Sequence, residues 1–268
     1  MNKITEITSR EFGAYIKGGG DLVFIPAASP ERLGPHLPVG ARGMIAEIIA
    51  DKFAEYYNGV SLPLIPYTTL YDDFEGRGSI DMDTALMNRY FTDVCDELTA
   101  NKMRRIIFIS FHQEFYYLCN EYFQDKNIAV AWLSPDKFPH TGLDRHGYEL
   151  WRFIACLRLA GNKAMIAKVF EKTRKYFGLQ PPENKRRDIL AMFGNTGYKI
   201  QGNEWRFYPV NFGKNLPGEG EFFTMPKDDM LDYAAHKLES WIKSFGEPLA
   251  ALTEYQEYLD ANPFVREF

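Results

Sequence analysis

Short apolar runs alternate with helix-patterned segments through the first half of this chain, and no other feature constrains the fold as strongly. The apolar runs lie at residues 22–26, 60–65, 105–110 and 128–133. Helical spacing of apolar residues is found at 44–57, 84–98 and 115–123. Strands that are apolar on both faces are typical of a parallel sheet with helices on either side. Because βαβ crossovers are right-handed, the pattern predicts a three-layer α/β/α sandwich around a mainly parallel sheet.

The second half of the chain is less regular. Apolar spacing predicts helices at 147–159, 164–177, 184–193 and 227–245. Residues 198–212 are aromatic and interrupted by glycine, which predicts a hairpin or an ordered loop. We find no internal repeat and no linker-like composition, so we expect a single domain over residues 1–268.

The composition restricts the class of partner. The chain has 268 residues, of which 46% are hydrophobic and 25% charged, as in globular proteins. A net charge of −5 argues against nucleic acid as the main partner, because binding to phosphates needs a basic surface. No apolar run reaches the roughly 18–20 residues of a membrane span. The three cysteines are scattered, and the N-terminal residues lack the apolar stretch of a signal peptide. We therefore expect a cytoplasmic globular protein.

The predicted strand ends carry most of the histidines. In open α/β sheets, ligands bind beyond the carboxyl ends of the strands. Four of the five histidines fall in the loops at this edge, namely His36, His112, His140 and His146. This clustering predicts a site in those loops.

Two of these loops contain side chains suited to binding a metal ion. His112 and Glu114 are two residues apart after one strand, so in an extended segment both could reach one ion. Glu31, in the loop after the first strand, could be a third ligand. The alternative is that both glutamates are surface carboxylates and His112 is a hydrogen-bonded loop residue.

A further pair lies where the helix near residue 147 begins. His146 and Glu149 have the i, i+3 spacing of a general acid–base pair, or alternatively of a helix cap with a solvated histidine. Aromatic residues flank all the candidate loops and favour a flat or ring-shaped ligand, with core or interface packing as the alternative. They are Tyr67, Tyr71, Phe74, Phe111, Tyr116, Tyr148 and Trp151. Within this set and the polar loop residues, we predict that Tyr71, Tyr148, His36 and Asp73 bind the substrate.

Several of these segments together resemble the creatininase (creatinine amidohydrolase) family. Residues 31–42 read ERLGPHLPVGAR and are similar to the family motif E-x-H-G-P-H-L-P-x-G-x-D. Residues 110–115, SFHQEF, are similar to N-G-H-x-[GE]-N, and residues 146–149, HGYE, to H-A-G-E. The similarity covers roughly residues 20–160, so 160–268 is the divergent part of the same domain.

The resemblance implies a hydrolase of C–N bonds in small or cyclic amides. Members of this family hold two divalent ions, usually zinc or manganese, and often assemble as hexamers, so a homo-oligomer is implied. Glu31, His112 and Glu114 match three of the metal ligands. His146 and Glu149 match the region that supplies acid–base and substrate-holding groups.

Two ligand positions depart from the family pattern. Leu33 stands where the family has a metal-binding histidine, and Arg42 stands where it has the aspartate that bridges the ions. Leucine cannot coordinate a metal, and a guanidinium repels a nearby cation. We therefore expect at most one divalent ion, zinc or manganese.

Three interpretations follow from these departures. One ion could remain on Glu31, His112, Glu114 or a subset of them, with His36 or Asp73 as a new ligand, and activate water. Alternatively, Arg42 could take over part of the charge of the missing metal, and His112, His146 and Glu149 would act as acid and base. That arrangement would also suit C–C hydrolysis of a keto-cyclitol ring, which a branch of the family performs. In the third interpretation the chain binds a small molecule without turnover. The acidic and histidine residues kept together at the strand ends favour an enzyme.

Overall fold

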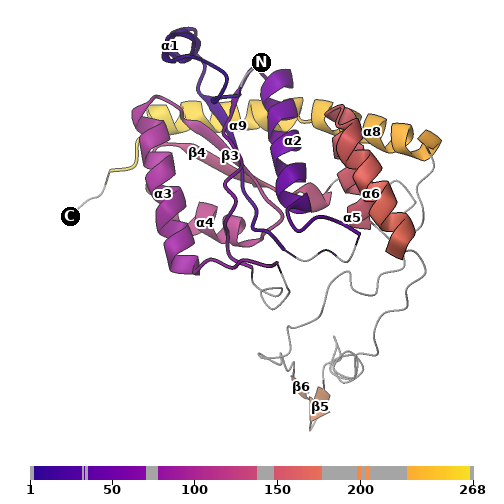
Figure 1. Cartoon of the computed structure of the whole chain (residues 1–268). Helices are drawn as coiled ribbons and strands as arrows, with labels where there is room; N and C mark the ends of the chain where they lie inside the picture. The colour runs from indigo at the N-terminus through magenta and orange to yellow at the C-terminus, as the bar shows by residue number, and fades with distance from the viewer. Residues whose placement is uncertain are drawn as a thin grey trace.

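Four parallel strands form the central sheet, in the order β2-β1-β3-β4 (Figure 1). They are β1 (Leu22–Pro26), β2 (Val60–Ser61), β3 (Arg105–Ile109) and β4 (Ala129–Leu133). The computed structural model describes residues 3–31, 33, 36–70, 78–137, 148–176, 198–200, 203–205 and 228–265. β1 and β3 lie in the middle and are almost entirely buried, as their continuous apolar sequences predict.

β2 is shorter than the predicted strand at 60–65. Its regular pairing with β1 ends at Ser61, and an isolated bridge joins Ala27 to Ile65 farther along. Pro63 lies in this gap, where the segment carries one more residue than the stretch of β1 beside it, as in a β-bulge. The backbone N–H groups of Leu62 and Ile65, on either side of it, still donate to carbonyls of β1.

One face of the sheet is covered by α2 (Ala41–Tyr56), α5 (Tyr148–Leu159) and α8 (Asp228–Lys243). Leu22 and Phe24 of β1 point into this layer. α6 (Lys163–Tyr176) packs on α5, and α9 (Gly246–Ala261) contacts β3 and β4. Figure 1 shows α8 in orange and α9 in yellow, one after the other, with α9 passing behind β3 and β4.

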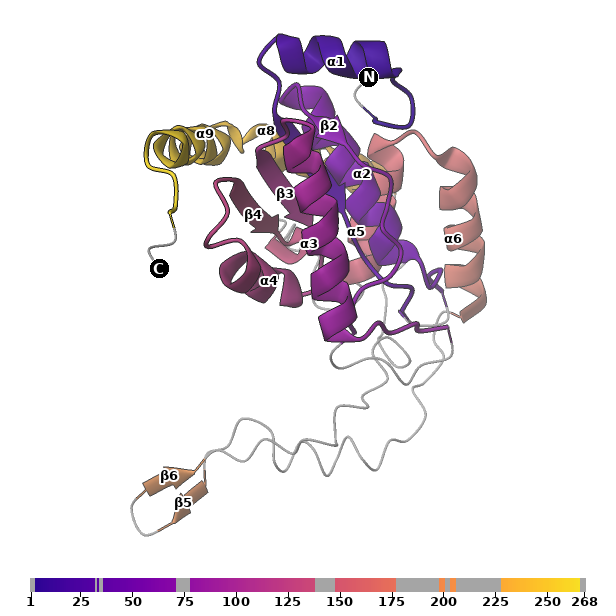
Figure 2. The same cartoon turned by 90° about the vertical axis from the view of Figure 1, so that its left-hand side faces the viewer.

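The opposite face is covered by α3 (Thr84–Ala100) and α4 (Glu114–Tyr122). Val23 and Ile25 of β1 point into this second layer, because successive side chains of a strand alternate between faces. α1 (Ser9–Lys17) lies beside the upper end of these elements in Figure 2. The two apolar layers on either side of one parallel sheet confirm the predicted three-layer sandwich.

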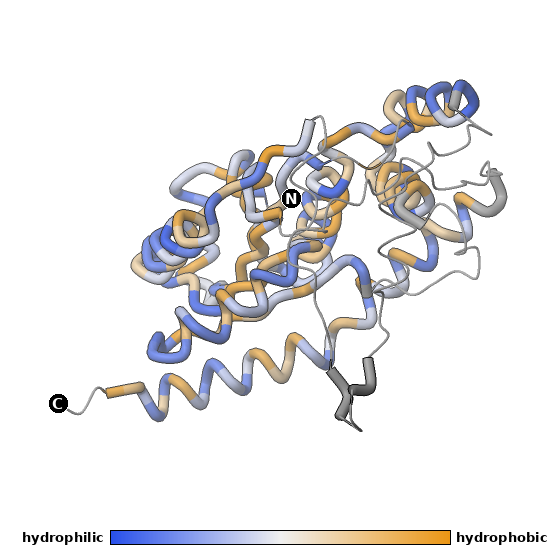
Figure 3. The backbone as a smooth tube through the Cα atoms, turned by 90° about the horizontal axis from the view of Figure 1, so that it is seen from below, coloured by the Kyte–Doolittle hydropathy of each residue, from blue (hydrophilic) through white to orange (hydrophobic). Residues whose placement is uncertain are grey.

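The sequence predictions fail mainly at the two ends of the chain. α1 and α9 were not predicted, although Thr8 and Glu11 form a capping box at the start of α1. The hydropathy colours of Figure 3 show apolar and polar residues interleaved along α9, the long helix that leads to the C-terminus. Its buried contacts are few, with Leu249 and Gln256 as its buried residues. A helix with so narrow an apolar stripe gives a weak periodic signal.

Two other predictions concern the stretch between α6 and α8. β5 (Tyr198–Ile200) and β6 (Asn203–Trp205) pair as an antiparallel hairpin, which agrees with one of the two predicted forms of residues 198–212. The helix predicted at 184–193 and residues 206–212 lie outside the described residues. Within the described part of the chain, no helix is both long and apolar enough to cross a membrane.

Candidate active site

The carboxyl ends of β1 and β3 bring together three of the residues that the sequence singles out. Glu31 follows β1, His112 follows β3, and Arg42 lies in the first turn of α2. The Glu31 side chain is 1% exposed, and its Oε2 accepts a hydrogen bond of 2.9 Å from Nη1 of Arg42. The Arg42 side chain is 21% exposed and is therefore the more accessible partner of this ion pair.

Local backbone structure fixes the two partners. The N–H of Glu31 donates to the carbonyl of Val39 at 2.8 Å, which closes the loop between β1 and α2. α2 begins immediately afterwards and comes close to the chain beyond β2, because Gly43 leaves room for Leu64. A Cβ at Gly43 would lie 2.8 Å from a methyl carbon of Leu64. The glycine therefore lets the first turn of α2 approach the sheet and bring Arg42 to Glu31.

His112 faces the same carboxylate from the neighbouring strand. Its Nε2 lies 3.9 Å from Oε1 of Glu31, beyond hydrogen-bond distance, and has no hydrogen-bond partner among the described residues. Burial, together with the charge of Arg42, lowers the pKa of His112 to about 3. The imidazole is therefore neutral at pH 7. Neutral imidazole can accept a hydrogen bond or a proton, and it can ligate a metal.

Two other residues that were predicted for the site, His36 and Glu114, are also buried. His36 is 4% exposed, in the loop between β1 and α2, and burial lowers its pKa to about 4. Glu114 is 9% exposed and is the first residue of α4. A helix N-terminus favours a carboxylate, because the backbone N–H groups there lack helical partners. Neither glutamate is the solvated surface carboxylate of the alternative interpretation.

The residues described here do not reproduce a two-ion centre. Leu33 is 5% exposed and packs in the core, and Arg42 forms an ion pair with Glu31. Across the described ranges, no group of three or more His, Cys, Asp or Glu side chains is arranged to hold a metal ion. The donor set thus fits a centre of two ions poorly, because a guanidinium already neutralises its buried carboxylate.

A second buried arginine lies on the other side of the loop after β3. The Arg42 guanidinium is 5.1 Å from the centre of the Phe111 ring, and the Arg152 guanidinium is 5.2 Å from it. Arg152 lies on α5, is 1% exposed, and donates from Nη1 to Asp136 at 2.9 Å. The Phe111 ring therefore contacts two guanidinium groups.

Sequence reasoning missed Arg152 and Asp136. A single arginine inside the apolar run of α5, LWRFIACL, was the available signal, because an unpaired charge is not tolerated in a buried stripe. A further link, also missed, joins the loops after β1 and β2. The Ser29 hydroxyl donates to the carbonyl of Thr68 at 2.7 Å and accepts from its N–H.

The remaining predicted residues cannot be placed. Tyr71, Asp73 and His146 lie outside the described residues, as does His140. Tyr148 and Glu149 belong to the first turn of α5, but their side chains lie outside the described part. Their roles stay predictions.

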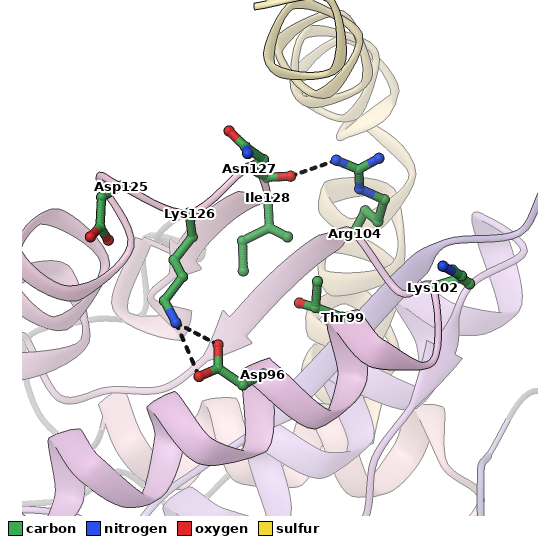
Figure 4. Close-up of a pocket in the computed structure, with 8 residues that line it drawn as sticks. All are labelled: Asp96, Thr99, Lys102, Arg104, Asp125, Lys126, Asn127 and Ile128. Atoms are coloured by element: carbon green, nitrogen blue, oxygen red, sulfur yellow. Dashed lines mark hydrogen bonds and ion pairs between the residues drawn. The ribbon is translucent and has the colours of Figure 1, made fainter. Parts of the chain in front are cut away.

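The opposite edge of the sheet also has a cleft, with a different character (Figure 4). It has a volume of about 400 Å³ and lies where β3 and β4 begin. Two of its charged groups form an ion pair, and a third donates to a backbone carbonyl. Lys126 contacts both oxygens of Asp96 at 2.7 and 3.0 Å, and Arg104 donates to the carbonyl of Asn127 at 2.7 Å. None of the predicted site residues lines this cleft.

Comparison with solved structures supports the fold. A creatininase variant of Zn–Zn type matches with a TM-score of 0.62 at 14% identity, over 92% of this chain and 97% of that chain. A manganese form of creatininase matches with the same TM-score at 13% identity, over 92% and 98%. A Bacteroides fragilis protein assigned as a creatinine amidohydrolase matches with a TM-score of 0.55 at 14% identity, over 99% and 98%.

The sequence comparisons identify the family. No curated protein sequence matches this chain significantly. The family profile described as creatininase, creatinine amidohydrolase, matches residues 5–192 and thus most of the chain. The profile includes β1, the loop with Glu31, the start of α2 and the His112 loop, which form the site described above. The chain therefore belongs to the creatininase family and has its hydrolase fold.

Proposed function

We propose that this chain is a hydrolase of a small carbonyl-containing compound, such as a cyclic amide, and that it works with at most one metal ion. The observation that carries the proposal is the buried ion pair of Arg42 and Glu31 beside the neutral imidazole of His112. Burying charged groups at the strand ends costs free energy, and apolar side chains could pack there without that cost. Their retention at the ligand-binding edge of the sheet supports a role in catalysis.

Arg42 is suited to bind the reacting carbonyl. It is the most exposed of the three groups, and a guanidinium donates hydrogen bonds to oxygen in a fixed planar geometry. Donors already in place where negative charge develops stabilise a tetrahedral intermediate more than the substrate. Arg42 would thus bind the substrate oxygen and stabilise the oxyanion that forms when water attacks.

Glu31 and His112 are suited to hold the attacking water. Two acceptor atoms 3.9 Å apart can each contact one water molecule. With a pKa of about 3, His112 is a weak base at pH 7, so it orients the water rather than taking its proton. The proton transfers would fall to His146 and Glu149, the predicted acid–base pair.

A metal ion has a restricted place in this scheme. Relatives with the same fold are a Zn–Zn type and a manganese form, so a metal is chemically reasonable in the family. Of the ligands predicted here, Glu31 and His112 would contribute to a single ion. Such an ion would supply Lewis-acid polarisation of a carbonyl. No step proposed above passes through it.

The test is a turnover screen with the untagged protein against cyclic amides, lactones and keto-cyclitols. We expect hydrolysis of at least one class and a loss of kcat of about 100-fold or more in Arg42→Ala, because one oxyanion donor is worth that much. The matched control is Arg105→Ala, at the opposite edge of the sheet, which should keep kcat. Hydrolysis of keto-cyclitols alone would replace C–N by C–C cleavage. Binding of these compounds without turnover would overturn the proposal in favour of a binding protein.

A further inference from the structure

We infer that the Arg42 guanidinium is a built-in substitute for a metal ion, and that removing its charge creates a zinc site on Glu31 and His112. The inference rests on the proposed site but not on the proposed hydrolysis, because it concerns what the buried carboxylate binds. It sharpens the expectation of at most one ion to no ion on Glu31 while Arg42 is in place.

Arg42 balances the charge of the Glu31 carboxylate. A carboxylate that is 1% exposed needs a positive partner to remain ionised. Arg42 is that partner, at 2.9 Å from Oε2. The same position in the family carries an aspartate, which adds negative charge and leaves the neutralisation to metal ions. Here the compensating cation is covalently part of α2.

Oε1 of Glu31 and Nε2 of His112 are close enough to become ligands of one metal ion. Oε1 of Glu31 and Nε2 of His112 both lie in the buried interior, and Nε2 has no hydrogen-bond partner among the described residues. Two ligands of one tetrahedral zinc lie about 3.4 Å apart, so the observed 3.9 Å needs a shift of only roughly 0.5 Å. Carboxylate oxygen and imidazole nitrogen are ordinary zinc donors.

Arg42 would repel a metal ion bound to Glu31. The guanidinium contacts the same carboxylate that would bind the ion, so a divalent cation on Oε1 would lie within a few ångströms of a fixed positive charge. At a partly buried site this repulsion is sufficient to weaken binding by about 100-fold or more. Arg42 therefore excludes the ion that it replaces.

Phe111 and Arg152 allow a matched control. Arg152 is a buried arginine whose guanidinium contacts the same ring, and its Nη1 donates to Asp136. Removing Arg152 takes away a buried positive charge and a contact with Phe111, but it leaves the ion pair of Arg42 with Glu31 in place. A general loosening of the loop should therefore follow from either substitution, but a zinc site should follow only from the loss of Arg42.

The experiment is a calorimetric zinc titration of the apo full-length chain, with thermal unfolding in parallel. We expect Arg42→Ala to bind one zinc ion at least about 100-fold more tightly than the wild type does. We also expect zinc to raise the Tm of this variant. Arg42→Lys keeps a positive charge and should bind no better than the wild type. Arg152→Ala should also show no gain, and Arg42→Ala with His112→Ala should lose the gained site.

Three outcomes would overturn the inference: equal zinc binding by the wild type and Arg42→Ala, a gain in Arg152→Ala, or a gain that survives His112→Ala. If Arg42→Ala does not fold, Arg42→Gln keeps most of the side-chain volume and carries the same prediction. Because these readouts do not involve turnover, the inference can fail while the hydrolase proposal stands. Equally, a failed substrate screen would leave the zinc result interpretable.

Discussion

The two edges of the central sheet both carry ion pairs, but they differ in how much water reaches them. At the edge where β3 begins, Arg105 pairs with Asp21, and both side chains keep about a fifth of their exposure. Lys126 and Asp96, nearby, are more exposed still. At the opposite edge, Glu31 and Arg152 are each 1% exposed. Charges at the first edge strengthen the structure at little cost, whereas the second edge carries charges whose burial is unfavourable.

This contrast indicates where function has shaped the chain. Replacing a buried ion pair by apolar residues is often neutral or stabilising, so stability alone does not explain one. Among the described residues, the buried Glu31 and Glu114 lie beyond the carboxyl ends of β1 and β3, where ligands bind in sheets of this kind. The cleft at the opposite edge contains charges that already pair with one another (Figure 4). We therefore assign chemistry to the edge with Glu31 and Arg42, and structural support to the edge with Arg105 and Asp21.

The largest effect should come from breaking one buried pair. Arg42→Ala leaves the Glu31 carboxylate buried beside a neutral imidazole, and we expect a loss of about 3 kcal/mol in the free energy of unfolding. Urea denaturation measures it. The double variant Glu31→Leu with Arg42→Met should recover most of the loss, because it removes both charges. If the double variant is as unstable as the single one, the loss comes from packing and the contrast between the edges weakens.

The next effect is a dependence of stability on pH. His36 and His112 have folded-state pKa values of about 4 and about 3, below the ordinary 6.5. At a pH between the folded-state pKa and 6.5, the unfolded chain binds a proton at each histidine that the folded chain does not bind. The free energy of unfolding is therefore highest above pH 6.5 and decreases as the pH falls below it. From pH 7 to pH 5 we expect a loss of about 2 kcal/mol for each histidine.

Denaturation curves at the two pH values provide the measurement. His112→Gln and His36→Gln should each show a shallower loss between pH 7 and pH 5 than the wild type. His236→Gln is the control, because His236 is exposed on α8. A loss that is unchanged in both variants of the buried histidines would mean that neither is held neutral by burial.

The smallest of these effects should come from the other edge. Arg105 contacts Asp21 through two nitrogens and also reaches Thr253 on α9. Because this pair is partly solvated, we expect Arg105→Ala to cost about 1–1.5 kcal/mol, less than Arg42→Ala. Salt should reduce the difference between Arg105→Ala and the wild type. A cost equal to that of Arg42→Ala would remove the distinction between the two edges.

The fold could be predicted largely because burial on both faces of a strand leaves a continuous apolar sequence. β1 and β3 are both of this kind, and every side chain of β1 is buried. β2 shows the limit of that signal. The pattern of apolar residues predicts a strand over 60–65, but it does not show that the regular pairing ends at Ser61, before Pro63. α9 shows another limit, since a helix that buries little has weak periodicity.

The site could be predicted in part, for a different reason. Loop position and a match to family motifs predict Glu31 and His112, and the departure from the same motif predicts Arg42. The structure brings these three residues together. The cation–ring stack of Arg42, Phe111 and Arg152 joins residues from three separate segments, and no local pattern records such a contact. The Arg152–Asp136 pair escaped for the same reason.

The most direct test of the central claim is the metal content of the untagged protein, purified without chelator and measured by plasma mass spectrometry. If Arg42 is the cation of this site, the wild type should contain well under one equivalent of zinc, manganese or iron per chain. The content should not change in His112→Ala. One or two equivalents in the wild type that are lost in His112→Ala would contradict the account, because a metal ion would then share Glu31 and His112 with Arg42 in place.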